Sequence, residues 1–228
     1  MGSKVSFSSN GSTCEGYLAV PESGSGPGVI VIQEWWGLVG HITDVADRFA
    51  EAGFVALAPD LYHGVVATEP DDARRLLMGM AMDVAAADIS GAADYLASLP
   101  SSSSPRIGTV GFCMGGSLAL WSATLAPQVA AAVAFYPGFP WERMAPKWQN
   151  YQGKSAIIHC SEADGTSAAP GIQLAKTAIE GAGGQVELFD YPGTQHAFFN
   201  SDRPEVFDPK SSDLAWERTI EFFRKNLG

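Results

Sequence analysis

The sequence predicts an α/β fold, in which a mostly parallel sheet of about eight strands is flanked by helices. Short apolar segments of strand length alternate with longer segments of helical periodicity along most of the chain. Several short segments are apolar at consecutive positions, as in GVIVIQ at 28–33, which is typical of parallel strands covered on both faces. A chain of 228 residues is long enough for one such core, so we expect residues 1–228 to form a single domain.

Each predicted element follows from a local pattern. At the N-terminus, Asn10-Gly11 separates two short strands, and this dipeptide favours the tight turn of a β-hairpin. Mostly apolar runs predict the remaining strands, at 28–33, 54–60, 106–112, 129–136, 155–160 and 186–191. Apolar residues at helical spacing predict the helices, at 41–53, 70–98, 114–125, 171–183 and 213–226. In sheets of this kind, ligands bind at the carboxyl ends of the strands, and we expect the chemistry there.

The composition disfavours several classes of partner. The formal net charge is −11 without a cluster of basic residues, which argues against binding to nucleic acid or an anionic membrane. No apolar segment has the length of a membrane span or a signal-peptide core. The three cysteines, Cys14, Cys113 and Cys160, form no CxxC pair, and no glycine-rich phosphate loop is present. We therefore expect a cytoplasmic monomer or small homo-oligomer that acts on a small molecule without a metal or cofactor.

The segment GFCMG at 111–115 has the G-x-C-x-G form of a nucleophile elbow, with cysteine in the position that serine often occupies. A nucleophile on such a strained turn needs small residues two positions away on either side, because larger side chains would collide with the adjoining strand and helix. The N-terminus of the following helix favours a thiolate. We predict that Cys113 is a nucleophile; the alternative is a buried, inert cysteine.

A nucleophile of this kind needs a base, and the chain has four histidines. His196 lies in a turn-rich loop just past a strand end and is the predicted base. We expect His41 to assist the start of its helix and His159, inside an apolar run, to be a packed core residue. His63 lies near the strand ends, but no carboxylate follows it in the required order.

The acid that orients the base should lie between the nucleophile and the histidine in the sequence. The stretch SEADG at 161–165 follows a predicted strand and contains two carboxylates. Asp164, followed by a glycine at which the chain can turn, is the predicted acid, and Glu162 is the alternative. Asp190 lies within a strand and is expected to be a solvent-facing or capping residue. Asp164 would hold the tautomer of the histidine and stabilise the imidazolium.

The loop after the first buried strand reads QEWWG. Oxyanion donors are expected from two backbone N–H groups, that of Met114 after the nucleophile and that of Trp35 in this loop. Glu34 precedes two tryptophans, and burying a carboxylate in such surroundings is costly unless it has a partner. We expect Glu34 to face the nucleophile; the alternative is a surface carboxylate at a strand end.

Together the segments QEWWG, APDLY, GFCMGG, SEADG and YPGTQHAFFN resemble the dienelactone hydrolase (carboxymethylenebutenolidase) family in their order and spacing. The resemblance covers nearly the whole chain. It implies an α/β-hydrolase fold without a large lid and a triad of Cys113, His196 and Asp164. It also implies that Glu34 hydrogen-bonds the resting thiol and helps to take its proton when substrate binds. Enzymes similar to these open enol lactones through a thioester intermediate.

The chemistry of sulfur agrees with this reaction. A thiolate attacks readily but also leaves readily, so it suits acyl groups whose departing oxygen is already a good leaving group. We therefore expect hydrolysis of lactones or activated esters. The alternatives are thioester cleavage or acyl transfer on the same triad, or a non-catalytic ligand-binding protein with this fold.

One part of the family pattern is missing. The resemblance implies arginines that hold the substrate carboxylate, one shortly after PDLY and one shortly after the catalytic histidine. Here His63-Gly64 and Asn200 occupy these places, while Arg74, Arg75 and Arg203 lie further along the chain as conceivable substitutes. We therefore expect a substrate other than dienelactone itself, in a broad and largely neutral pocket. The residues expected to bind it are Trp36, Tyr136, Trp141, Phe199 and Asn200.

Overall fold

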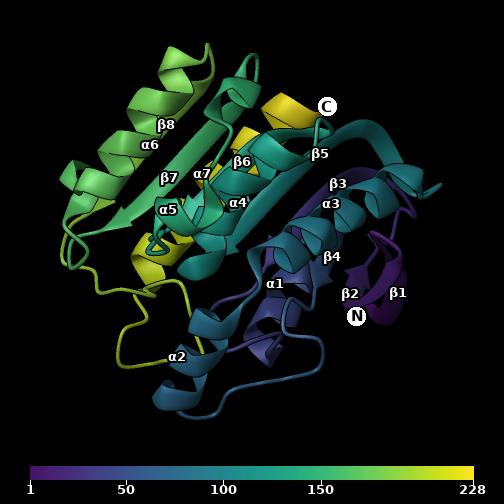
Figure 1. The fold of residues 1–228 in the computed structure, drawn as a ribbon, viewed down its shortest axis with the longest axis horizontal. Helices are drawn as coiled ribbons and strands as arrows, with labels where there is room; N and C mark the ends of the chain where they lie inside the picture. Colours follow the sequence, from purple (N-terminus) through teal and green to yellow (C-terminus); the bar gives the residue numbers. More distant parts are fainter.

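The computed structural model describes all 228 residues and contains one eight-stranded sheet with helices on both faces (Figure 1). The strands are β1 (Ser3–Ser9), β2 (Ser12–Ala19), β3 (Gly26–Ile32), β4 (Val55–Pro59), β5 (Ser102–Phe112), β6 (Val129–Phe135), β7 (Ser155–Ser161) and β8 (Gln185–Tyr191). They lie in the order β1-β2-β4-β3-β5-β6-β7-β8. The predicted α/β fold and the predicted number of strands are confirmed.

The order of the strands determines where the site lies in the sheet. β1 and β2 form the predicted antiparallel hairpin, and β2 pairs antiparallel with β4. The other six strands, β3 to β8, are all parallel to one another. From β3 the chain runs outward to β4 and then crosses back to β5 on the other side of β3. The loops after β3 and β5 therefore diverge at the switch point of the sheet, where a crevice opens at the carboxyl ends of the strands.

Helices cover the two faces of the sheet and close two hydrophobic cores. They are α1 (Gly40–Glu51), α2 (Pro70–Gly79), α3 (Met82–Ser98), α4 (Met114–Leu125), α5 (Trp141–Met144), α6 (Pro170–Gly181) and α7 (Pro209–Leu227), with 3₁₀ turns at Trp148–Tyr151 and Thr166–Ala168. Along β3, Ile30 and Ile32 pack toward α3 and α4, whereas Val29 and Val31 pack toward α1 and α7. This alternation explains the continuous apolar run, because both faces of the strand are buried.

The helical periodicity of residues 70–98 corresponds to two helices that meet at an angle of 87°. Met80 and Ala81 are extended and break the helix. The guanidinium of Arg143, on α5, donates hydrogen bonds to the carbonyl oxygens of Leu77, Met78 and Met80, at 3.1, 3.2 and 3.0 Å. These bonds satisfy carbonyls that would otherwise lack partners at a helix end. A contact between residues so far apart in the sequence leaves no local signal, which is why the break was not predicted.

The C-terminal helix begins earlier than predicted. Asp208 accepts a hydrogen bond of 2.7 Å from the N–H of Ser211, and Pro209 occupies the first helical position. Aspartate at the N-cap followed by proline is a known helix start, so the signal was present in the sequence. No helix on its own has the length and hydropathy to cross a membrane; α2 and α3 together satisfy those two criteria, across the sharp bend between them.

Candidate active site

Cys113 lies at the sharp turn between β5 and α4 and is half-buried. Its φ is 57°, in a region that non-glycine residues rarely adopt and that marks a strained turn. A Cβ on Gly111 would lie 2.0 Å from the carbonyl oxygen of Gly115, and one on Gly115 would lie 2.3 Å from the carbonyl oxygen of Gln33. The steric reason predicted for the glycines is therefore confirmed, and Cys113 stands at the N-terminus of α4.

His196 and Asp164 approach each other from the loops after β8 and β7. Nδ1 of His196 lies 2.7 Å from Oδ2 of Asp164, and Gly165 follows the acid with a left-handed φ of 92°. Ser161, at the end of β7, donates a hydrogen bond to the same carboxylate oxygen. Burial raises the pKa of Asp164, but the hydrogen bonds from His196 and Ser161 outweigh burial and leave the pKa below its ordinary value. The acid is therefore ionised at neutral pH.

The pKa of His196 depends on both Asp164 and Cys113. Burial lowers the pKa of His196, but the hydrogen bonds and charges of Asp164 and Cys113 outweigh burial and raise it to about 10. An imidazolium therefore persists at neutral pH beside the sulfur. Because the folded-state pKa exceeds the unfolded value of about 6.5, this charge stabilises the fold fully below that pH. The stabilisation is lost as the pH rises through about 10.

The carboxyl group of Glu34 is buried, with 2% of the residue exposed, so the alternative of a surface carboxylate is wrong. Oε2 accepts a hydrogen bond of 2.9 Å from the amide of Asn200, whereas Oε1 has no partner in the protein. Burial raises the pKa of Glu34, and the Asn200 amide and the charges of His196 and Arg203 offset only part of this effect. A buried carboxyl group with a raised pKa is suited to exchanging a proton in the site.

Tyr136 follows β6 with a φ of 37° and is 1% exposed. Its ring lies edge-on to the imidazole of His196, with centroids 5.0 Å apart. The hydroxyl has no hydrogen-bond partner, although buried tyrosines usually find one. Burial and then the charges of Glu34 and Cys113 raise the pKa of Tyr136 well above its ordinary value, so the hydroxyl keeps its proton and can donate it in a hydrogen bond.

The other residues predicted to bind substrate are divided between the rim of the site and the interior. Trp35 and Trp36 form a half-buried edge-to-face pair with centroids 5.1 Å apart, and Trp141 is half-buried on α5. Phe199 is 1% exposed and packs in the core between the sheet, α1 and α7, so it does not line the crevice. Both polar atoms of the buried Asn200 are used within the protein, since Oδ1 accepts from the N–H of Asp202.

Two amides are available as oxyanion donors. The N–H groups of Trp35 and Met114 have no partner among the loop and cap hydrogen bonds. Met114 is the first residue of α4, where amides lack partners within the helix. Trp35 follows β3 and Met114 follows β5, the two strands on either side of the switch point, and the two N–H groups remain the predicted oxyanion donors.

The remaining histidines have other surroundings. His159 is fully buried between the hydroxyl of Tyr191 at 2.7 Å and that of Thr219 at 3.1 Å, and burial lowers its pKa to about 3. It is the packed core residue that was predicted. His41 is 3% exposed and makes no capping hydrogen bond to α1, so the expectation that it assists the helix start is wrong. It packs edge-on against Phe112.

Glu162 and Asp190 accept hydrogen bonds from other loops, and two of the three arginines form ion pairs with neighbouring carboxylates. Glu162 accepts a hydrogen bond from the N–H of a glycine in the next loop, and Asp190 accepts two from the backbone and hydroxyl of Ser167. Of the arginines, Arg203 forms an ion pair with Glu205 at 2.9 Å. The other two lie exposed on α2, where Arg75 pairs with Asp72 and Arg74 has no side-chain bond.

Comparison with known proteins places the chain in a family. The family model described as the dienelactone hydrolase family matches residues 14–227. The Aquifex pyrophilus protein usf is 38% identical over 234 residues, and a "Putative carboxymethylenebutenolidase" of Aquifex aeolicus (strain VF5) is 35% identical over 235 residues. Both alignments cover 100% of this chain and 100% of the relative.

A solved structure shows the same fold. It is a dienelactone hydrolase-like promiscuous phosphotriesterase from metagenomic libraries, 22% identical, with a TM-score of 0.86 over 100% of this chain and 99% of that one. Because the family model spans almost the whole sequence and the relatives match it from end to end, the chain belongs to the dienelactone hydrolase family and is an ester or lactone hydrolase with the α/β-hydrolase fold.

Proposed function

We propose that the protein hydrolyses lactones or activated esters through a thioester on Cys113. The observation that carries this proposal is the 2.7 Å contact between the imidazole of His196 and the carboxylate of Asp164, together with the effect of Cys113 on the pKa of that imidazole. The thiolate attacks the acyl carbon and forms the C–S bond, while the N–H groups of Trp35 and Met114 stabilise the oxyanion. The acyl C–O bond then breaks, and the imidazolium gives its proton to the departing oxygen.

The second half of the reaction reverses the proton movement. Water attacks the thioester carbonyl, and the now neutral imidazole of His196 takes a proton from this water. The C–S bond breaks, the acid product leaves, and the thiolate and imidazolium are restored. Asp164 holds the imidazole in position through its 2.7 Å contact. The buried carboxyl of Glu34, with its free oxygen and raised pKa, is a second group suited to exchanging a proton, while each turnover closes between Cys113, His196 and water without it.

A hollow beside the histidine favours neutral substrates. It has a volume of about 400 Å³ and is formed by residues 137–142, 169–172 and 174. Gly138 connects it to the site, since a Cβ there would lie 4.0 Å from Cε1 of His196 and its N–H donates to the carbonyl oxygen of Cys113 at 3.4 Å. The lining is largely apolar, its one charged side chain is that of Glu142, and no basic residue lines it. A carboxylated ring would meet repulsion here and no partner.

Matched pairs of lactones and aryl esters, with and without a carboxylate, test this substrate class. We expect kcat/KM to be about 10-fold higher for the neutral member of each pair, equivalent to roughly 1.4 kcal/mol. Glu142→Lys should reduce this preference, because it replaces the negative charge of the hollow with a positive one. Glu217→Lys makes the same change of net charge at an exposed position on α7 and should leave the preference unchanged. A wild-type preference for the carboxylated members would contradict the neutral hollow.

A further inference from the structure

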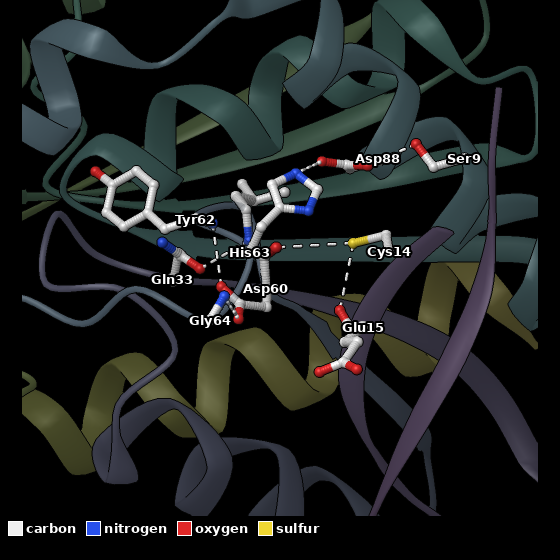
Figure 2. A network of polar contacts seen from close by, with 10 residues as sticks. Ser9, Cys14, Glu15, Gln33, Asp60, Tyr62, His63, Gly64 and Asp88 are labelled. Atoms are coloured by element: carbon white, nitrogen blue, oxygen red, sulfur yellow. Dashed lines mark hydrogen bonds and ion pairs between the residues drawn. The ribbon is translucent and has the colours of Figure 1, made fainter. Parts of the chain in front are cut away.

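The turn after β4 is held by an unusual number of polar contacts (Figure 2). Oδ1 of Asp60 accepts a hydrogen bond of 3.1 Å from the N–H of Tyr62, and Oδ2 accepts one of 2.6 Å from the N–H of Gly64. His63 has a φ of 51°, which is a strained conformation for a residue with a side chain. Backbone strain of this kind persists only where the surrounding structure enforces it, and it is found most often at functional sites.

A buried carboxylate enforces the conformation of this turn. Asp88, on α3, is 1% exposed; its Oδ1 accepts from the hydroxyl of Ser9 at 2.5 Å, and its Oδ2 lies 3.0 Å from Nε2 of His63. Oδ2 has no partner other than this ion pair with His63, so the ion pair is what compensates its burial. Cys14 packs against the turn as well, with its sulfur 3.7 Å from the carbonyl oxygen of Asp60. The turn is therefore tied to α3 and β2.

The side chain of Tyr62 points away from the turn on the side opposite to that of His63 (Figure 2). It is 8% exposed, and its hydroxyl lies 3.5 Å from Sδ of Met114, the residue after Cys113. A thioether is a weak acceptor, so this buried hydroxyl, in contact with the residue that follows the nucleophile, has its donor almost unused. Burial and then the charge of Cys113 raise the pKa of Tyr62, which keeps the hydroxyl protonated.

We infer that Tyr62 is a further catalytic residue, whose hydroxyl donates a hydrogen bond to the acyl oxygen of the bound substrate beside the N–H of Met114. His63 and Asp88 are positioning residues that hold the hydroxyl in place. No proton is transferred in this contact. The hydroxyl stabilises the negative charge that develops on the acyl oxygen, and a donor already held in position needs no reorganisation during the reaction. The inference rests on the proposed thioester mechanism, since it concerns the oxygen of the acyl group that the thiolate attacks.

Tyr62→Phe tests the donor, because it removes only the hydroxyl. We expect kcat for p-nitrophenyl acetate to fall by about 100-fold with little change in KM, as for the loss of one oxyanion donor. Tyr151→Phe is the matched control, since Tyr151 is fully buried and donates to the carbonyl oxygen of Leu120 far from the crevice. Its kcat should equal that of the wild type. A Tyr62→Phe enzyme with kcat within twofold of the wild type would overturn the inference.

A double-mutant cycle tests the positioning role. Asparagine tolerates a positive φ but is too short to reach Asp88, so His63→Asn keeps the turn and removes the contact. We expect it to lower kcat about 3- to 10-fold in the wild type and not at all in the Tyr62→Phe background. Equal effects in both backgrounds would show a merely structural contribution and would overturn the positioning role. Failure of the proposed mechanism is distinguishable, because it would appear as turnover that survives Cys113→Ala.

Discussion

Replacing Cys113 with alanine is expected to lower kcat/KM for p-nitrophenyl acetate by about 10⁴-fold or more, which corresponds to at least about 5.5 kcal/mol of transition-state stabilisation. The reason is that no other group near His196 can form the acyl bond. The hydroxyl of Ser161, which lies beside the pair of His196 and Asp164, donates its hydrogen bond to Asp164 and is buried. Initial rates of p-nitrophenolate release, measured on protein with an unchanged circular dichroism spectrum, give the ratio.

The matched control is Cys160→Ala, which removes a thiol from the end of β7. Cys160 is 3% exposed, and burial raises its pKa to about 12, so it remains a thiol at neutral pH. We expect its kcat/KM to stay within twofold of the wild type, with some loss of stability from the cavity. Retention of most activity by Cys113→Ala, or a comparable loss in Cys160→Ala, would contradict the assignment of the nucleophile.

Gly111→Ala is expected to destabilise the fold by about 3 kcal/mol or more, one of the largest effects available from a single methyl group. The added Cβ would lie 2.0 Å from the carbonyl oxygen and 2.3 Å from the carbonyl carbon of Gly115, and backbone atoms inside the elbow cannot move aside as a flexible side chain can. For a chain of 228 residues this loss corresponds to a decrease in Tm of roughly 6–12 °C. Differential scanning calorimetry measures it directly, and failure to fold would be the same effect in its extreme form.

The matched control is Gly181→Ala. Gly181 ends α6, and no atom lies within 4 Å of the position that its Cβ would take. Alanine has the higher helix propensity, so the Tm of this variant should be equal to or slightly above that of the wild type. A Tm for Gly111→Ala that matches the wild type would show that the elbow has room for a side chain, against the steric argument for the glycines.

Much of the fold was predictable because its determinants are local. Strands buried on both faces need consecutive apolar residues, as in β3 and β6, and a nucleophile elbow needs small residues at fixed positions around Cys113. The same holds for the approach of His196 to Asp164. Parallel strands end at one edge of the sheet, so residues just after β7 and β8 must lie near each other.

The features that were missed depend on contacts between distant segments. The bend between α2 and α3 is capped by Arg143 from α5, and the turn that carries Tyr62 is held by Asp88 from α3. Phe199 has the residue type of a pocket wall, yet the direction of its side chain places it in the core. Asn200 likewise holds Glu34, because the fold closes the loop after β8 over the loop after β3. Sequence periodicity contains no information on such pairings.

The account depends above all on the formation of a covalent bond between the acyl group and the sulfur of Cys113. Rapid acid quenching during turnover of p-nitrophenyl acetate, followed by peptide mass spectrometry, measures this bond directly. The account predicts an added acetyl group on the peptide that contains Cys113, sensitive to hydroxylamine as thioesters are, and its absence in Cys113→Ala. An acetyl group carried by a serine such as Ser161, or turnover without any acetylated protein, would contradict it.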